Sequence, residues 1–463
     1  MAENVKSTID SIVAVHAKSG AKVIRKSARG HHVVELPMAA IRHLALFRPD
    51  LIIEEDKPLQ SFRMPGLPVL ISEVTKQKLI VRVIDREGSP IPDCTVYAVG
   101  SVIGFRGITN RRGEVELGVD ASLLERIIIS PRTNYWSKVL ASSDVPLQKR
   151  IDVVLAQLNP VTASDWVHRL IGVSNLHGAL TGRGVKVAII DSGIAPVPGL
   201  HVTGGFNTLD GGDPAAWFED EQGHGTHCAG IIAAQPNGND ARIRGIAPEA
   251  EIFALKVFPG GFVSDLIEAI DWCCENGIDL INMSLGSPEP SAALAQAIES
   301  AYAAGVAIIA ATGNDGSHIA FPGSHPRVIA VSALGRLGTF PSDSAHILKI
   351  GHQRDWWGGL FDANFNNYGP EVMVCAPGVA IISTVPQGYA AWDGTSMASP
   401  VICGLLALVL ESNPALRTHS STQVDALRWI ASAGAANTGM PSVIQGFGLG
   451  TATQMLRVAG QLW

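Results

Sequence analysis

Short runs of apolar residues alternate with longer amphipathic stretches in the second half of the chain. Four runs are almost continuously apolar, at residues 185–190, 252–257, 280–284 and 306–311. Such runs are typical of parallel strands that are covered on both faces. Between them Ala, Leu, Ile and Glu recur at helical spacing, at residues 226–234, 264–276 and 291–304. The pattern predicts an α/β fold with a doubly wound parallel sheet, and Asp191, Ser284 and Asn314 fall at the carboxyl ends of strands, where such sheets bind ligands.

A different pattern precedes residue 160. Residues 78–85 and 94–99 alternate between apolar and polar side chains around a turn, and residues 107–117 follow as strand, turn and strand. Short strands at this spacing predict a small antiparallel β-sandwich at residues 76–157. Its layout is similar to that of transthyretin-like modules, the carboxypeptidase-regulatory kind. The module could be a structural spacer or could bind a ligand.

Residues 1–75 predict a small α+β segment. Helical spacing is found at residues 37–47, and the remaining apolar stretches favour strands, at residues 11–16, 21–26, 33–36 and 51–56. Together they give a β–α–β outline. The chain is therefore expected to have three parts, at residues 1–75, 76–157 and 160–463.

Composition and charge narrow the classes of function. The 463 residues are 46% hydrophobic and 17% charged, as in a globular protein with ample core. A net charge of −7 without basic clusters argues against nucleic acid or an anionic membrane as partner. No apolar run is expected to reach the roughly 18 residues of a membrane helix. The first residues carry charges and no apolar signal region, so we expect a cytoplasmic protein.

Three motifs along the chain contain, in order, a carboxylate, an imidazole and a hydroxyl, the groups that together make a serine nucleophilic. They are Asp-Ser-Gly at 191–193, His-Gly-Thr-His at 224–227 and Gly-Thr-Ser-Met-Ala-Ser-Pro at 394–400. A serine hydroxyl becomes nucleophilic when a neutral imidazole removes its proton, and a carboxylate fixes the tautomer of that imidazole. Asp191, His224 and Ser396 suit these roles. Asn314 could donate a hydrogen bond to an oxyanion.

Each motif also has a simpler interpretation when it is taken alone. The serine motif could cap a helix, and Asp191 and Asn314 could be turn residues. His224 and His227 could bind a metal ion one helical turn apart, although the spacing suggests no third ligand. Coincidence is a poor explanation for all four positions together.

The order Asp191, His224, Asn314, Ser396 resembles that of the subtilisin-like serine proteases, the subtilases. The resemblance implies a serine endopeptidase that hydrolyses peptides or unfolded proteins through an acyl-enzyme on Ser396. It also implies that residues 1–75 are a propeptide, an intramolecular inhibitor whose tail at residues 55–65 enters the active-site cleft. A small α/β appendage that never meets the active site is the alternative.

The resemblance extends to the residues that would bind substrate. One segment matches the strand on which subtilases bind an extended peptide, and a second would complete the walls of the pocket for the residue before the cleaved bond. Small wall residues favour an apolar side chain in that pocket, and an aromatic residue would bound a more distant one. The predicted substrate-binding residues are Ser284, Leu285, Gly286, Ala311, Thr312, Gly313 and Phe262.

The chain departs from the family pattern in two places. Gly199 stands where a calcium-binding Asp is often found, and the loop 235–240 only partly matches the usual calcium loop. We therefore predict no cofactor, with calcium possible but unsupported at that site. Residues 335–367 form an insertion that could contact substrate or another domain. Its polar and aromatic residues include His346, His352, Asp355, Trp356 and Trp357.

Two other activities fit the same motifs. A peptide-ligating or cyclising transferase would form the same acyl-enzyme and pass it to an amine instead of water. A catalytically retired peptide-binding protein would keep the fold without the chemistry, although every catalytic position is filled here.

Overall fold

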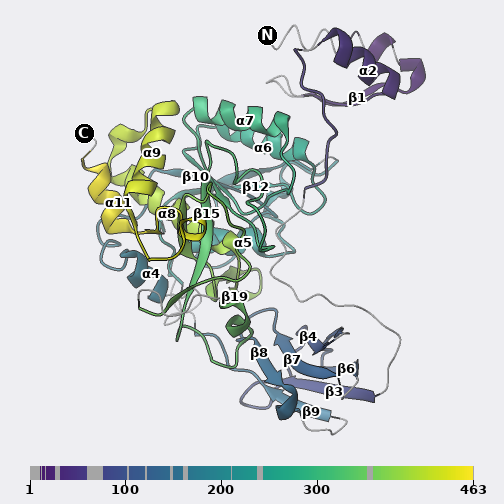
Figure 1. The fold of residues 1–463 in the computed structure, drawn as a ribbon, viewed down its shortest axis with the longest axis vertical. Coiled ribbons are helices and arrows are strands. Elements are labelled where there is room, and N and C mark those ends of the chain that lie inside the picture. Colours follow the sequence, from purple (N-terminus) through teal and green to yellow (C-terminus); the bar gives the residue numbers. More distant parts are fainter. Residues whose placement is uncertain are drawn as a thin grey trace.

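The computed structural model describes residues 11–461, except for 12, 16, 27–31, 49, 60–76, 102–103, 120–122, 146–149, 160–164, 210, 237–242 and 352–357. A ten-stranded sheet crosses the larger part of the molecule (Figure 1). In spatial order its strands are β11 (Gly204–Asn207), β12 (Glu251–Lys256), β10 (Lys186–Asp191), β13 (Leu280–Met283), β14 (Ala307–Ala311), β15 (Ile329–Arg336), β17 (Val374–Pro377), β21 (Leu449–Gly450) and β20 (Ala435–Ala436), and β16 (Leu360–Asp362) pairs with β15. Every pair from β11 to β21 is parallel, which confirms the doubly wound parallel sheet.

Helices cover both faces of this sheet. They are α4 (Asp165–Ile171), α5 (His224–Ala233), α6 (Val263–Glu275), α7 (Ala292–Ala303), α8 (Thr395–Ser412), α9 (Ser421–Ala433), α10 (Ser442–Gln445) and α11 (Ala452–Ala459), with short 3-10 turns η3 (Ala216–Phe218), η4 (Ala345–Lys349) and η5 (Pro414–Leu416). Successive residues of β10 face two cores. Val187 and Ile189 pack with α5, α8 and α9, whereas Ala188 and Ile190 pack with α6 and α7. Burial on both faces explains why the strands are uninterrupted apolar runs.

Residues 395–410 of helix α8 are all buried. Among the helices that the structure describes, its 18 residues alone are long and apolar enough to cross a membrane, so the expectation that no apolar stretch reaches this length was wrong. The same stretch is 89% buried inside the protein. This burial is typical of the core helix of a globular domain. Pro400 lies in the second turn of α8, and the helix continues through it.

The β-sandwich consists of two sheets around one apolar core that includes Val81, Val96 and Ile127. One sheet has the order β6 (Glu114–Val119), β3 (Gln77–Ile84), β9 (Arg150–Val154), and the other β5 (Gly104–Ile108), β4 (Thr95–Gly100), β7 (Leu124–Ser130), β8 (Lys138–Ala141), followed by the turn η2 (Ser142–Asp144). All pairs are antiparallel except β3 with β9, which run parallel because the chain crosses back from the other sheet.

The N-terminal segment contains a two-stranded sheet and a helix. Its elements are η1 (Ala17–Ser19), β1 (Lys22–Lys26), β2 (His32–Glu35) and α2 (Met38–Phe47). Residues 11 and 13–15 are helical, so the strand expected at 11–16 was wrong. A run of a few apolar residues does not distinguish a helix from a strand by its period.

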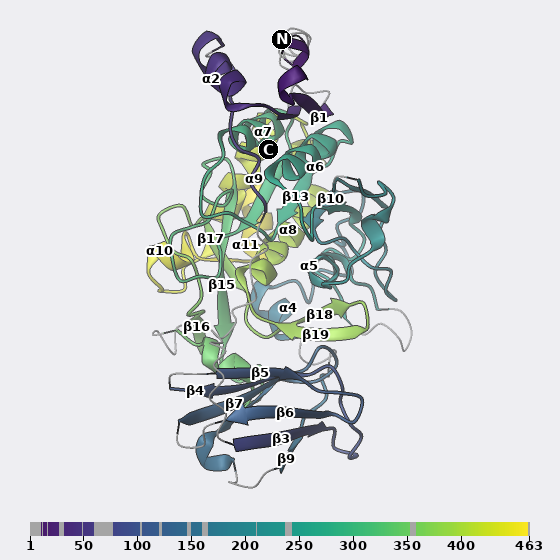
Figure 2. The ribbon, with the colours of Figure 1, turned by 90° about the vertical axis from the view of Figure 1, so that its right-hand side faces the viewer.

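The three parts are arranged along the long axis of the molecule. Figures 1 and 2 show the N-terminal segment at one end, beyond α6 and α7, and the β-sandwich at the other end. The antiparallel hairpin of β18 (Ile381–Val385) and β19 (Gly388–Trp392) lies on the side of the sheet domain that faces the sandwich. This hairpin leads directly into α8.

Candidate active site

Asp191 is the last residue of β10, at the carboxyl edge of the sheet. Its side chain is 2% exposed, and its Oδ1 accepts a hydrogen bond from the backbone N–H of Ser192 at 2.7 Å. Both carboxylate oxygens also lie close to Nδ1 of His224, at 2.8 and 2.9 Å. The carboxylate is therefore held against one edge of the imidazole ring.

His224 is the first residue of α5, where a sharp turn aims its ring across the end of the sheet. Gly223 makes this turn with a φ of 75°, a left-handed conformation that glycine adopts without steric cost. Burial by itself would lower the pKa of His224. The charge and the hydrogen bond of Asp191 outweigh it, and the pKa is raised above its ordinary value. Asp191 thus stabilises the protonated ring and directs its Nε2 away from the carboxylate.

A second carboxylate braces this pair. Oδ1 of Asp220 accepts hydrogen bonds from the hydroxyl of Ser192 and the N–H of Gly223, both at 2.8 Å. Oδ2 accepts two more from Thr226, from N at 2.9 Å and from Oγ1 at 2.6 Å. Asp220 therefore caps the N-terminus of α5 and fixes the strand end that carries Asp191. Sequence reasoning missed this residue, although its position four residues before His224 was a signal.

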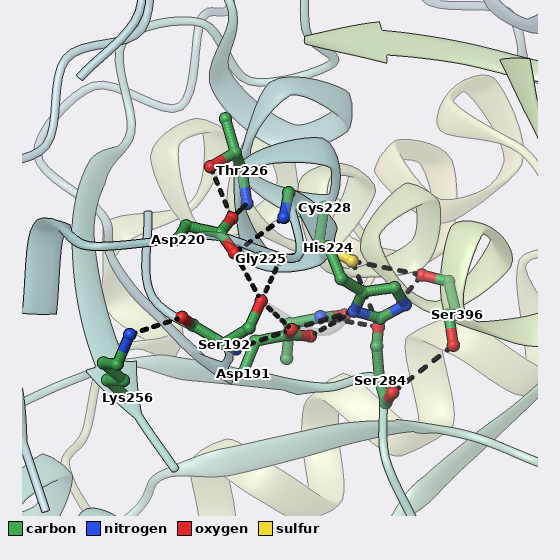
Figure 3. Close-up of polar contacts among 12 residues, drawn as sticks. Asp191, Ser192, Asp220, His224, Gly225, Thr226, Cys228, Lys256, Ser284 and Ser396 are labelled. Atoms are coloured by element: carbon green, nitrogen blue, oxygen red, sulfur yellow. Dashed lines mark hydrogen bonds and ion pairs between the residues drawn. The ribbon is translucent and has the colours of Figure 1, made fainter. Parts of the chain in front are cut away.

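Ser396 lies in the first turn of α8, and its side chain is 2% exposed. Its hydroxyl donates to the carbonyl of Ser284 at 3.3 Å, and its own carbonyl accepts from the Ser284 hydroxyl at 2.9 Å. Figure 3 shows the His224 ring with Asp191 on one side and Ser396 on the other. The structure thus brings together the three residues that the motifs predicted for the nucleophilic centre.

Cys228 lies beneath these groups. Its thiol donates to the carbonyl of Ser396 at 3.4 Å, and its sulfur lies within 4.8 Å of the facing ligand atoms of Asp191 and His224. Burial raises the pKa of Cys228 well above its ordinary value, so the sulfur stays a neutral thiol. It fills the floor of the site as a packing group.

Asn314 faces the start of α8. Its Oδ1 accepts hydrogen bonds from both N and Oγ1 of Thr395 at 2.9 Å, which fixes the amide with its NH2 group free to donate. A methyl group added to Gly394 would lie 3.3 Å from Nδ2 of Asn314 and 3.6 Å from the backbone nitrogen of Ser396. Glycine at this position leaves a space beside two N–H donors. That space has the chemistry needed to hold an oxyanion.

His227 does not form a metal site with His224. Its Nε2–H donates to the carbonyl of Ala390 at 3.1 Å, and its ring stacks on Trp392 with centroids 4.5 Å apart. Burial lowers the pKa of His227 to about 3, so the ring is neutral. Among the described residues, the one group of three potential ligands is Asp191, His224 and Cys228, which is the centre already described. Part of the loop considered for calcium, at 237–240, lies outside the described residues.

The residues predicted to bind substrate lie around this centre. Leu285 is 1% exposed, and the hydroxyl of Ser284 donates to the carbonyl of Ser396, so neither side chain is offered to a peptide. Hydrogen bonds join the wall segments to one another: Ser287 pairs with Phe321 at 2.7 and 2.8 Å, and Ala320 donates to the carbonyl of Thr312 at 3.0 Å.

The second wall segment is tied to the nucleophile loop. Gly313 donates its N–H to Oγ1 of Thr395 at 3.1 Å, and Ala311 and Thr312 are fully buried. Gly286, which follows Leu285 in the first wall segment, is also buried. Phe262 lies apart, 41% exposed, and its backbone pairs with Pro58 of the chain's own N-terminal segment. The structure thus places Phe262 beside the chain's own tail.

The insertion at 335–367 was expected to contact substrate or another domain, and the structure describes only part of it. Residues 352–357, with His352, Asp355, Trp356 and Trp357, lie outside the described residues. His346 is on η4, almost fully buried, and its Nδ1 lies 2.7 Å from Oδ1 of Asp393. It therefore faces the core beside the nucleophile loop.

Comparison with known proteins identifies one family. The model of the subtilase family matches residues 182–450. Subtilisin BL from Lederbergia lenta is 39% identical over 240 residues, which are 51% of this chain and 79% of the relative. Subtilisin DY from Bacillus licheniformis is 39% identical over 253 residues, 52% of this chain and 81% of the relative.

One solved structure adds a comparison of the fold. It belongs to the proteases of Pseudoalteromonas arctica, is 24% identical, and has a TM-score of 0.50 over 62% of this chain and 94% of its own. The likeness shows the fold. The family match does not reach the N-terminal segment or the β-sandwich, whose predicted likenesses to a propeptide and to transthyretin-like modules stay predictions.

Proposed function

This chain belongs to the subtilase family and is a subtilisin-like serine protease, and we propose that it hydrolyses peptide bonds through an acyl-enzyme on Ser396. The observation that carries the residue assignment is the contact of His224 Nδ1 with both oxygens of Asp191, at 2.8 and 2.9 Å, beside a serine at a helix N-terminus. The chain supplies the nucleophile, the base, the carboxylate and the oxyanion donors that this mechanism uses.

The first half of the reaction forms the acyl-enzyme. Nε2 of His224 takes the proton of the Ser396 hydroxyl as its oxygen attacks the substrate carbonyl carbon. The resulting oxyanion accepts hydrogen bonds from Nδ2 of Asn314 and from the backbone N–H of Ser396. His224 then gives its proton to the leaving amine, the C–N bond breaks, and the acyl group stays on Ser396.

The second half repeats these steps with water. His224 removes a proton from water, the hydroxide attacks the acyl carbon, and the proton returns to the Ser396 oxygen as the ester bond breaks. Asp191 keeps Nδ1 protonated and stabilises the imidazolium in both halves. Because the ring must be neutral to act as a base, activity should rise as pH increases through the raised pKa of His224.

The substrate proposal follows from the walls of the site. A peptide in extended conformation would pair with the backbone of 284–286, since backbone pairing gives affinity with little dependence on sequence. Leu285, Gly286 and the segment 311–313 offer no charge to a side chain between them, which favours an apolar residue before the cleaved bond.

A mixed peptide library tests hydrolysis against transfer. In water enriched in heavy oxygen, we expect mass spectrometry to find fragments whose new carboxyl termini carry the label. The C-terminal residue of these fragments should be apolar in most cases. Longer or cyclic products without label would instead identify a transferase, because an amine would then have intercepted the acyl-enzyme. Intact peptides together with saturable binding would identify a retired peptide-binding protein.

We also propose that the N-terminal segment restrains the protease. Its acidic end reaches the N-termini of two helices of the sheet domain: Asp56 accepts from N and Oγ of Ser264 at 3.0 and 2.7 Å, and Glu54 accepts from the N–H groups of Ala292 and Ala293 at 3.0 and 3.1 Å. These contacts satisfy amide donors that helices α6 and α7 leave free.

Backbone pairing continues toward the substrate-binding side. Lys57 accepts from the N–H of Val263 at 2.9 Å, and the N–H of Leu59 donates to Gly261 at 2.7 Å. Farther back, Arg25 forms ion pairs with Asp265 and Glu268, both at 2.6 Å. The rest of the predicted tail, from residue 60 to 65, lies outside the described residues.

Cutting and inhibition can be measured separately. N-terminal sequencing should find a new terminus between residues 55 and 76 in the wild-type protein and none in Ser396→Ala. In the uncut chain, the double variant Glu54→Ala, Asp56→Ala should raise peptidase activity, because each lost cap weakens docking by about 1 kcal/mol, or roughly fivefold. Arg48→Ala is the matched control, since Arg48 pairs with Asp50 inside the segment. Full activity of the uncut wild type would reduce the segment to an appendage.

A further inference from the structure

A buried histidine–aspartate pair lies outside the catalytic mechanism. Nδ1 of His346, on η4 of the insertion, is 2.7 Å from Oδ1 of Asp393. The two side chains are 4% and 10% exposed. Nε2 of His346 is buried and has no hydrogen-bond partner among the described residues, so Asp393 is the polar contact that the structure shows for the ring.

Asp393 begins the loop that delivers the nucleophile. Its Oδ1 also accepts from the N–H of Ala380 at 2.8 Å. The next residue, Gly394, donates to the carbonyl of Gly378 at 2.8 Å, and Thr395 follows with its bonds to Asn314. Three consecutive residues before Ser396 are thus anchored, and the first anchor is a buried carboxylate.

That carboxylate needs its partner. Burial alone would raise the pKa of Asp393, but the His346 ring, Lys349 and the Ala380 N–H together hold it below its ordinary value. Asp393 is therefore an anion in the core. Without the His346 donor this charge would lose the closest of these partners, and removing a partner from a buried charge is destabilising.

The β-sandwich reaches the same pair. The ring of Trp136, in the connection between β7 and β8, packs edge-on against His346 with centroids 5.7 Å apart. Ser137 holds the start of η4, because its Oγ lies 3.1 Å from Ser344 Oγ and accepts from the N–H of Ala345 at 3.1 Å. The module therefore fixes the turn on which His346 stands.

A second contact leads from the module to the catalytic histidine. Asn134 pairs with Tyr389 of β19, with N–H to carbonyl at 2.7 Å and side-chain oxygen to N–H at 3.0 Å. Trp392, at the end of the same strand, stacks on the His224 ring with centroids 6.3 Å apart and planes inclined by 18°. Both routes from the module converge on residues 389–396.

We propose that His346 is a positioning residue for Ser396 and that docking of the β-sandwich, through Trp136 and Asn134, holds residues 389–396, from β19 to the start of α8, in their reactive geometry. The β-sandwich would then contribute to catalysis, because its contacts keep Ser396 in position. The inference rests on the proposed function, in which Ser396 is the nucleophile.

The test compares two substitutions of His346. His346→Phe keeps a ring but removes the donor, and it should lower both kcat and the rate of fluorophosphonate labelling roughly 10- to 100-fold, since small misplacement of a reacting group has such effects. KM should change by less than about twofold, because ground-state binding does not depend on the loop geometry. His346→Asn places an N–H near the position of Nδ1 and should recover most of the rate. Trp136→Leu should lower the rate in the same direction.

Arg417→Gln controls for a general loss of stability. It breaks another ion pair of a buried carboxylate, in which Arg417 contacts Asp279 at 3.0 and 2.9 Å. Asp279 lies next to the amino end of β13 and so at the opposite edge of the sheet. We expect this variant to lose stability and keep its labelling rate. An equal loss of labelling in Arg417→Gln, or no rescue by His346→Asn, would overturn the proposal.

Hydrogen exchange separates this inference from the proposed function. In a Ser396→Ala background, which needs no chemistry, His346→Phe should speed amide exchange in residues 380–396 and leave the strands of the sandwich protected. Unchanged exchange there, with a wild-type labelling rate for His346→Phe, contradicts the positioning role. If wild-type protein takes up no fluorophosphonate while the exchange effect is present, the proposed function fails and the loop anchor stands.

Discussion

Ser396→Ala is expected to lower kcat by about 10⁶-fold, the loss typical of removing the nucleophile from a Ser–His–Asp triad. The oxygen of the Ser396 hydroxyl is the atom that forms the covalent bond, and Ser396 combines a position at a helix N-terminus with a place beside His224. The fold should persist, because the hydroxyl makes one hydrogen bond, to the carbonyl of Ser284 at 3.3 Å.

A fluorophosphonate probe followed by peptide mapping provides the measurement. Wild-type protein should carry the label on Ser396, and the variant should carry none. Ser399→Ala is the control, because Ser399 lies one turn later on the same helix and is fully buried with its Oγ bonded to Asn282 at 2.7 Å. Labelling that persists in Ser396→Ala would remove the assignment of the nucleophile.

Asn314→Ala is expected to lower kcat by roughly 10²- to 10³-fold with little change in KM. Its Nδ2 group meets charge that exists only while the carbonyl carbon is tetrahedral, so substrate binding does not use it. The side-chain oxygen also anchors Thr395, and part of the loss could come from that bond. Asn314→Asp keeps the acceptor for Thr395 while removing the donor, and it should be as slow as the alanine variant.

Steady-state kinetics with one peptide substrate measures both constants. Asn364→Ala serves as a matched control, since Asn364 is exposed and its side chain donates to the carbonyl of Leu348 at 2.8 Å. A kcat for Asn314→Ala equal to that of wild type would move the oxyanion site elsewhere. A fast Asn314→Asp variant would mean that anchoring Thr395 is the main role of the side chain.

The sheet domain was predictable because its signals are local. The central strands β10, β13 and β14 are buried and mostly apolar, and each predicted catalytic residue ends or follows a strand or lies at the start of a helix, as Asp191 and His224 do. Parallel strands end at one edge, so residues far apart in sequence are expected to meet there.

Contacts between distant segments were not predictable in this way. Asp220 supports both Asp191 and His224, yet nothing in its own neighbourhood says which donors it will meet. The parallel pairing of β3 with β9 depends on where the chain crosses between sheets. His346 was noticed as a polar residue in a long loop, but its partner Asp393 is 47 residues away. The cytoplasmic location and the absence of a nucleic-acid partner stay predictions.

The distance between Asp56 and Ser264 along the sequence has a consequence for the order in which the chain is synthesised and folds. The two residues are 208 positions apart, so at 5–20 residues per second Asp56 leaves the ribosome roughly 10–40 s before its partner. The sandwich, whose strand pairs all fall within residues 77–154, can fold during that delay. When α6 and α7 emerge from the ribosome, Asp56 and Glu54, whose carboxylates bind the first turns of these helices, have already been synthesised. The protease domain therefore completes its fold with the restraining segment already present.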